Sequence, residues 1–211
     1  MTEELTPERR WYIAGRWQHF EGELRANQYR LLGILLFYAN ELVNYYGLDL
    51  GFIQFPKVAS VTKELHGSIT LLCTAWVLAA WLVQVTLARR VFPPSLKYLT
   101  TAVDLVTATA VLMIADGPRS PLVAGYFVII NLAALRLDAA LVRLTTAGAV
   151  AGYLAVLGYA AWYRPELKVP RYHEVIMLLS LSLAGLFVAD VVKRIRQFAE
   201  DATAAPAEEV A

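Results

Sequence analysis

Polar and titratable side chains gather near the ends of several apolar segments. Glu41 and Asn44 close the first segment, His66 precedes the second, and Arg171 and His173 precede the last. In an antiparallel helix bundle these five side chains share one depth. There they can line a small-molecule or proton-responsive pocket, because histidine titrates in the physiological pH range. The alternative is a set of interfacial side chains that only form hydrogen bonds.

Other chemistry has little support in the sequence. His66 and His173 are of the residue type that holds a haem iron from opposite sides, but no spacing motif accompanies them, so haem is a remote candidate and no other cofactor is expected. Cys73 stands alone, which excludes an internal disulfide and a multi-cysteine metal site. The chain has no phosphate-binding glycine-rich loop, zinc-ligand spacing or nucleophile elbow. We therefore expect neither an enzyme nor a metal site.

Asp104 lies inside an apolar segment, eight residues after Leu96. At 1.5 Å per helical residue this places its carboxylate about 12 Å into a membrane. A charge at that depth costs several kcal/mol, so Asp104 is a functional candidate. The alternative that we favour is a structural ion pair with Arg143 or Arg136, whose long side chains can reach inward from the ends of neighbouring segments.

A short polar turn separates the third and fourth segments. It holds Asp116, Arg119 and Ser120, and Ser120 followed by proline is typical of a helix start. The free N–H groups of that helix start, together with Arg119, could hold an anion. We favour the simpler interpretation, a tight capped turn in which Arg119 pairs with Asp116.

Gly148 and Gly152 are four residues apart in the fifth segment. Small residues at this spacing let a second helix approach closely. The second helix belongs either to the same bundle, which we take as the default, or to another subunit.

The elements that must position these residues are membrane helices. Hydrophobic residues make up 58% of the 211 residues and the mean hydropathy is +0.48, which is too apolar for a typical water-soluble domain. We predict an all-α, polytopic membrane helix bundle, since a helix crosses a hydrocarbon core of about 30 Å with about 20 residues. Six segments are expected to cross it: Leu31–Tyr46, Ser68–Ala88, Leu96–Ala115, Pro121–Leu137, Ala139–Tyr163 and Val175–Val192.

The positive charges predict the orientation of these helices. Thirteen of the 19 lysines and arginines fall on the side that carries both termini, and six fall on the other. Positive residues are retained on the cytoplasmic face, so both termini are expected in the cytoplasm.

Three regions follow from this pattern. In residues 1–28, Trp11 and Trp17 alternate with arginines, which is typical of an amphipathic helix on the lipid headgroups. This region has no nucleic-acid-binding motif. Residues 29–197 are the expected six-helix transmembrane domain. Residues 198–211 are expected to be a disordered cytoplasmic tail, because they contain too few apolar side chains to pack a core.

Residues of the third and fourth segments carry a resemblance. Asp104, Asp116-Gly117, Ser120-Pro121 and Tyr126 resemble the N-terminal six-helix membrane sensor modules of bacterial histidine kinases of the pilus- and nitrogen-regulation type, and those of membrane-anchored adenylate cyclases. The resemblance covers roughly residues 65–197. This chain departs from the pattern of those families at Asp116, where they usually have the first glycine of a glycine pair. The ligand of those families therefore cannot be assigned to this chain. The resemblance implies a multi-pass protein of the bacterial cytoplasmic membrane.

In those families the last helix continues into an output domain. Here Val191, Ile195 and Phe198 follow the spacing of a helix that packs against a partner, and a proline-containing tail then follows. We therefore expect a sensor-like input module without its own catalytic domain, which relays to another membrane or membrane-associated protein, or to a second copy. The alternative is a structural or accessory subunit of a larger membrane complex.

Overall fold

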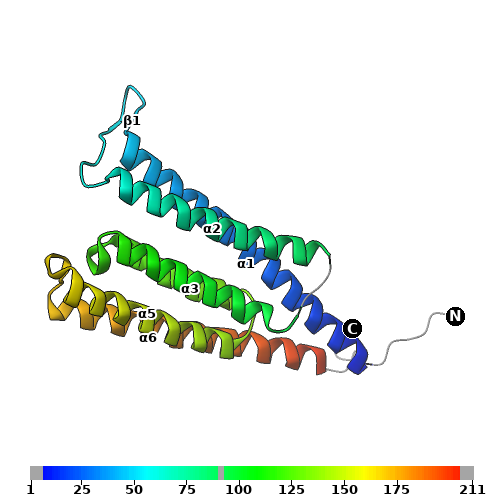
Figure 1. Ribbon diagram of the computed structural model, residues 1–211. Coiled ribbons are helices and arrows are strands. Elements are labelled where there is room, and N and C mark those ends of the chain that lie inside the picture. Colours follow the sequence, from blue (N-terminus) through cyan, green and yellow to red (C-terminus); the bar gives the residue numbers. More distant parts are fainter. Residues whose placement is uncertain (1–6, 90–92, 205–211) are drawn as a thin grey trace.

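The computed structural model describes the backbone of residues 7–89 and 93–204, and the side chains of these ranges except residues 7–16, 18, 19 and 202–204. This part of the chain folds into six α-helices that alternate in direction (Figure 1). The expectation of a helical fold is confirmed. The helices are α1 (Pro7–Tyr46), α2 (Lys63–Ala88), α3 (Leu96–Ile114), α4 (Gly125–Ala134), α5 (Ala139–Tyr163) and α6 (Arg171–Ala204).

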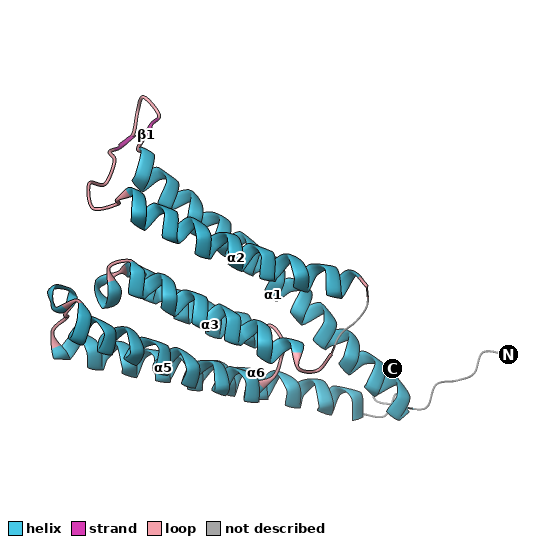
Figure 2. Ribbon diagram, in the orientation of Figure 1, coloured by secondary structure: helices cyan, strands magenta, loops and turns pink. Residues whose placement is uncertain are grey.

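The connections lie at two opposite ends of the bundle. A small antiparallel hairpin of β1 (Leu48–Asp49) and β2 (Gln54–Phe55) joins α1 to α2, and the α3–α4 and α5–α6 turns lie at this same end, which we call the hairpin end (Figure 2). The α1 start and the α6 end lie together at the opposite, terminal end (Figure 1).

Among the described residues, four helices are long and apolar enough to cross a membrane: α2, α3, α5 and the Arg171–Asp201 part of α6. The protein is thus a helical membrane protein. The first and fourth of the six expected segments are not among these four helices. The α1 helix carries several charged residues, and α4 has only ten residues, which span about 15 Å. A 3-10 turn, η2 (Pro121–Ala124), precedes α4 and extends its apolar stretch to 14 residues.

Two predicted boundaries are wrong. The α1 helix runs unbroken for 40 residues, so there is no separate surface helix that ends at residue 28. Nothing in this stretch stops a helix, because its only proline is Pro7, at the helix start. The last helix continues to Ala204, inside the 198–211 region that was expected to be a disordered tail, while residues 205–211 lie outside the described range.

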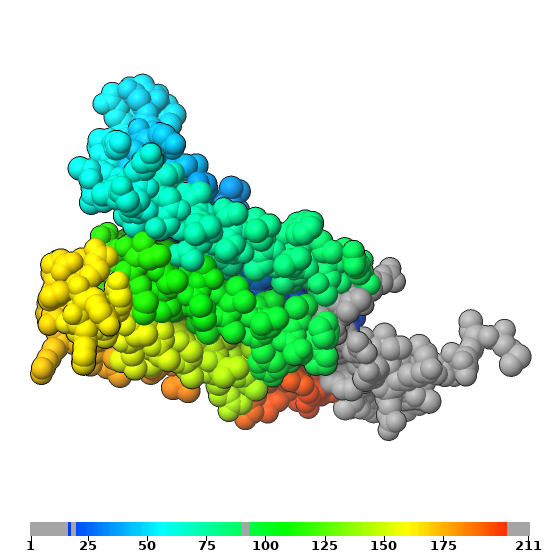
Figure 3. Space-filling model, in the orientation of Figure 1, coloured from blue at the N-terminus to red at the C-terminus, as the bar shows by residue number. Residues whose placement is uncertain are grey.

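The helices form two groups. The α3–α6 group has a continuous core around Tyr126, Ile130, Leu141 and Tyr153, all buried. The α1–α2 pair has a small apolar cluster of its own, and it diverges from α3–α6 toward the hairpin end (Figures 1 and 3). A second small apolar cluster, of Val83 and Leu87 of α2 with Leu96 of α3, joins the two groups. Because this apolar contact is small, we expect polar contacts to add to the attachment.

Tight glycine contacts hold the α3–α6 group together. A Cβ atom on Gly148 would lie 2.5 Å from the Leu105 side chain of α3, and one on Gly152 would lie 2.7 Å from both Thr109 and Tyr126 oxygens. These glycines therefore pack within the chain, as the default interpretation expected.

The α3–α4 turn is capped as expected but paired differently. Ser120 accepts a hydrogen bond from the Leu122 N–H at 3.2 Å. Arg119 donates to the Lys168 carbonyl at 2.9 and 3.2 Å, and its predicted pairing with Asp116 is wrong. The physical reason is that the α5–α6 turn lies beside this turn and offers a free carbonyl. Arg119 is thus a bridge between two turns.

Candidate functional site

Three polar residues of α1 face the other helices. Glu23, Asn27 and Arg30 are spaced by four and three residues, so they project from one helix face, and each is at most 4% exposed. They meet polar groups of α2, α3 and the α4–α5 turn. The resulting interhelical polar cluster consists of these three residues with Trp76, Gln84, Thr100, Thr101, Asp104 and Arg136.

One half of the cluster is the ion pair of Glu23 with Arg136. The guanidinium donates to the two carboxylate oxygens at 2.6 and 2.9 Å, and both side chains are almost fully buried. Arg136 also donates to the hydroxyls of Thr100 and Thr101 at 3.0 and 3.1 Å. This geometry allows α1, α3 and the α4–α5 turn to meet without an unpaired charge.

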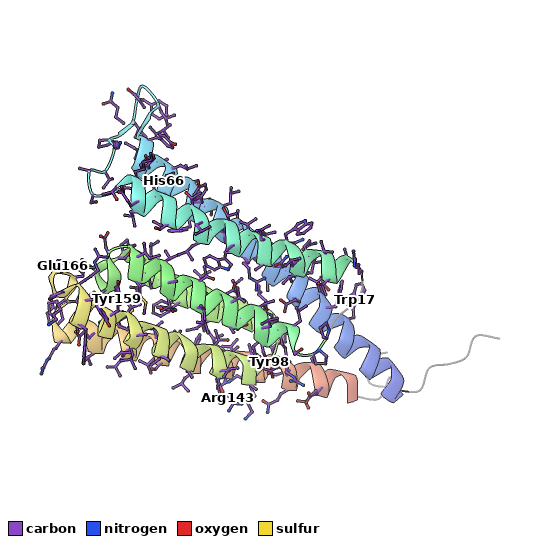
Figure 4. The ribbon with its side chains drawn as sticks, in the orientation of Figure 1. Trp17, His66, Tyr98, Arg143, Tyr159 and Glu166 are labelled. Atoms are coloured by element: carbon purple, nitrogen blue, oxygen red, sulfur yellow. The ribbon has the colours of Figure 1, made fainter. Side chains whose placement is uncertain are left out.

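The other half contains Asp104. The prediction that Asp104 pairs with Arg143 or Arg136 is wrong. Arg30 donates to both Asp104 oxygens at 2.7 and 2.9 Å, and the Trp76 indole N–H donates to the same carboxylate at 2.8 Å. Arg143 is exposed on α5 and donates to the Ala139 carbonyl of its own helix, and Figure 4 shows it on the face turned away from α1 and α2. Arg136 forms its ion pair with Glu23 instead.

Asn27 links both halves to α2. It accepts from Arg30 at 2.7 Å and donates to the Ala80 carbonyl and to Gln84 at 3.1 and 3.0 Å. The cluster carries two positive and two negative side chains and is therefore neutral. A neutral set in which each charge is paired is the form in which charges are tolerated in an apolar interior.

Two cavities flank the Arg30–Asp104 pair. One, of about 310 Å³, lies between α1, α2, α3 and α4, and the other, of about 250 Å³, lies between α2 and α3. Arg30, Asp104 and Trp76 line both cavities, and nearly all other lining side chains are apolar. The ion pair is thus a polar contact between the two groups of helices, with a largely apolar cavity on either side of it.

A second polar group lies nearer the hairpin end, between α1 and α2. His66 Nδ1 is 3.5 Å from Glu41 Oε1, and neither atom has a hydrogen-bond partner among the described residues. The Tyr45 ring stacks on His66 at 4.0 Å between centroids. Figure 4 shows His66 at this end of α2. The prediction that Glu41 and His66 share a site thus agrees with their placement.

The remaining members of the predicted pocket lie apart. Asn44 is half-buried, and its backbone carbonyl accepts from the Val58 N–H at 2.9 Å. Arg171 and His173 are exposed at the start of α6, in the other group of helices. No described contact joins His173 to His66, which is enclosed by tyrosines of α1. The geometry therefore brings together two of the five residues and offers no shared axial site for a haem.

The sequence interpretation missed most of the interhelical polar cluster. Glu23 and Arg30 were not singled out from the sequence, although their spacing on one helix face is a signal that they meet other helices. Trp76 carried no comparable signal, because a tryptophan in an apolar helix is ordinarily lipid-facing or core.

An ion pair joins the start of α3 to the start of α5. Lys97 Nζ lies 2.5 Å from the Asp138 carboxylate, which also caps α5 by accepting from the Ala140 and Leu141 N–H groups. Burial alone raises the pKa of Asp138, but the hydrogen bonds and the positive charge of Lys97 outweigh it and hold the pKa below its usual range. Asp138 therefore stays charged and anchors the α4–α5 turn.

The chain matches no protein-family model, no curated protein and no solved structure.

Proposed function

We propose that this protein is a membrane-embedded, sensor-like input module that couples the separation of α1–α2 from α3–α6 to a partner through α6. One observation carries the proposal. The two groups of helices are joined by a small neutral polar cluster with a cavity on either side of it. A ligand that enters a cavity can shift the two groups relative to each other, because packed interfaces have discrete arrangements.

The proposed topology has six crossings, with both termini in the cytoplasm of a bacterium and the hairpin end outside. Its support is the alternation of the six helices and the excess of lysine and arginine at the terminal end. In this arrangement α1 crosses with the buried Glu23, Arg30 and Glu41 turned toward protein. The α4 helix with η2 forms a short crossing that lies against α5.

The relay element is α6. It runs for 34 residues, more than a membrane crossing needs, and its terminal part exposes Val191, Ile195 and Phe198 on one side. Apolar side chains at this spacing beyond a membrane segment suit packing against another helix. A partner protein, and not a catalytic activity of this chain, is therefore the proposed output.

The relay is tested with spin labels at the hairpin end. Cysteines at exposed Lys63 of α2 and Glu166 of the α5–α6 turn report the separation of the two groups, on a Cys73→Ser background. Addition of total bacterial lipid extract to the protein in nanodiscs should shift this distance distribution. A control pair at Asp116 and Glu166, both within the α3–α6 group, should not move. An unchanged Lys63–Glu166 distance would contradict the relay.

The second candidate function is an accessory subunit of a larger membrane complex. Its support is that every charged group of the polar cluster is paired, as in a rigid structural element. Both functions expect Phe198→Glu to release a partner that co-purifies in mild detergent, with the neighbouring exposed Gln197→Glu as control. Only the input module also expects the spin-label distance to respond to lipid.

A further inference from the structure

The larger cavity has the form of a site for a small molecule. Its volume of about 310 Å³ lies at the lower end of the range for ligand pockets, which is about 300–1,000 Å³. Its walls are apolar side chains of four helices, including Phe37, Leu112, Leu122 and Ile129. Such a site fits a molecule that is mainly apolar.

The polar wall of the cavity has hydrogen-bond donors to spare. An arginine carries five N–H groups, and three of those on Arg30 are used, two for Asp104 and one for Asn27. The remaining two N–H groups have no recorded acceptor among the described residues. Asp104 neutralises the guanidinium charge, so the site favours an uncharged acceptor over an anion, whose burial would cost far more.

The mouth of the cavity faces the membrane. Tyr29 of α1 and Val128 of α4 line it and are 56% and 55% exposed, and neither is charged. Exposed apolar side chains on a membrane helix contact lipid, so a ligand reaches this cavity from within the bilayer. The direction of entry again selects a membrane-soluble molecule.

We propose that this cavity binds a membrane-soluble molecule through an uncharged carbonyl oxygen that accepts from Arg30. A quinone ring and the ester group of a phospholipid both supply this chemistry. The proposal rests on the proposed function for the membrane placement of the cavity, and it names the ligand class that would separate the two groups of helices.

Two glycines allow the cavity to be filled without damage to the fold. Gly33 of α1 and Gly125 at the start of α4 both line it, and no atom lies within 4 Å of a Cβ built on either. Leucine at these positions enters open space and has the better helix propensity. Gly158 of α5 is also helical, with nothing within 4 Å of its Cβ, and it does not line the cavity, so Gly158→Leu is the matched control.

Binding is measured by quenching of Trp76, which lines the cavity. The other four tryptophans are replaced by phenylalanine, and the protein is placed in nanodiscs and titrated with decylbenzoquinone. We expect saturable quenching that is about tenfold weaker in Gly33→Leu and in Gly125→Leu and unchanged in Gly158→Leu. Equal binding by all four proteins would overturn the assignment of the cavity.

Two further probes test the carbonyl and its source. Decylbenzene, which has no carbonyl, should compete about tenfold less well than decylbenzoquinone, and equal competition would overturn the role given to Arg30. Phosphatidylcholine with brominated chains replaces the quinone in a separate titration. Quenching by the phospholipid that Gly33→Leu weakens supports a lipid ester as the ligand, and quenching by the quinone alone supports a quinone.

The binding experiment and the spin-label experiment can contradict one proposal while the other is retained. Binding that Gly33→Leu weakens, without a change in the Lys63–Glu166 spin-label distance, retains the site and contradicts the relay. A spin-label shift on addition of lipid extract that persists in Gly33→Leu and Gly125→Leu retains the relay and overturns this cavity as the ligand site.

Discussion

Replacement of Glu23 by leucine leaves Arg136 as a buried positive charge without its counter-charge. Both side chains of this pair are at most 2% exposed, so water cannot solvate the remaining guanidinium. Removal of one partner from a buried ion pair costs about 3–5 kcal/mol of the free energy of unfolding. We expect Glu23→Leu and Arg136→Met each to lower the free energy of unfolding by that amount.

The double variant Glu23→Leu, Arg136→Met has a different expected result. It removes both charges, and it leaves no orphaned hydroxyl, because Thr100 and Thr101 each still donate to the Lys97 carbonyl, at 3.2 and 2.8 Å. Replacement of a complete buried pair by apolar side chains of similar volume is often close to neutral. We therefore expect the double variant to lie within about 1 kcal/mol of the native protein.

The assay is unfolding in mixed micelles with increasing denaturing detergent, followed by tryptophan fluorescence. The matched control is the pair of Arg25 with Glu21 on the same helix, at 2.6 Å but with side chains 62% and 42% exposed. Arg25→Met should cost no more than about 0.5 kcal/mol, as is typical of exposed pairs four residues apart.

Additivity is the result that would refute this reasoning. If the double variant is destabilised by the sum of the two single effects, within about 0.5 kcal/mol, Glu23 and Arg136 do not act as a pair. The same conclusion follows if Glu23→Leu costs no more than Arg25→Met.

Two other substitutions test how the α4–α5 turn is held. A Cβ on Gly22 would lie 2.6 Å from the Leu135 carbonyl oxygen, so Gly22→Ala should push α1 from this turn and cost about 1–3 kcal/mol, whereas Gly33→Ala has open space and should not destabilise the fold. Thermal unfolding of the two variants checks this, and equal midpoints would contradict it. The lowered pKa of Asp138 stabilises the fold above the unfolded value of about 3.9, and this contribution is lost as the pH falls through the lower folded pKa. Asp138→Asn should therefore be less stable than the native protein at pH 6, and the two should converge as the pH falls through the lowered folded pKa of Asp138. A gap that is constant over this range would show that the ion pair with Lys97 is not its source.

Much of the helical pattern was predictable because its signals are local. Ser120 caps the turn before α4, as expected from the residue types alone. Pro93 and Pro94, which cannot continue a helix, lie between α2 and α3. The length of α1 was not predicted. Its polar residues were interpreted as the end of a surface segment, although no helix-breaking residue follows Pro7 and the helix simply continues.

The candidate site was predictable only in part. Asp104 stood out because a carboxylate in an apolar segment requires a partner, and Glu41 and His66 stood out because they flank the same loop. The identity of the Asp104 partner could not follow from the same logic. Arg143 is closer in sequence, but the rotation of α5 turns it outward, away from the other helices.

The sequence alone determined that this chain is a helical membrane protein, where most of its helices end, and that a charge inside it needs compensation. These properties depend on hydropathy and on residues within one or two turns of each other. The tertiary structure alone decided which charges meet. Arg30 reaches Asp104 across 74 residues, and Glu23 reaches Arg136 across 113. Such pairings depend on how each helix is rotated and which helices are neighbours, and both are set by packing of the whole bundle.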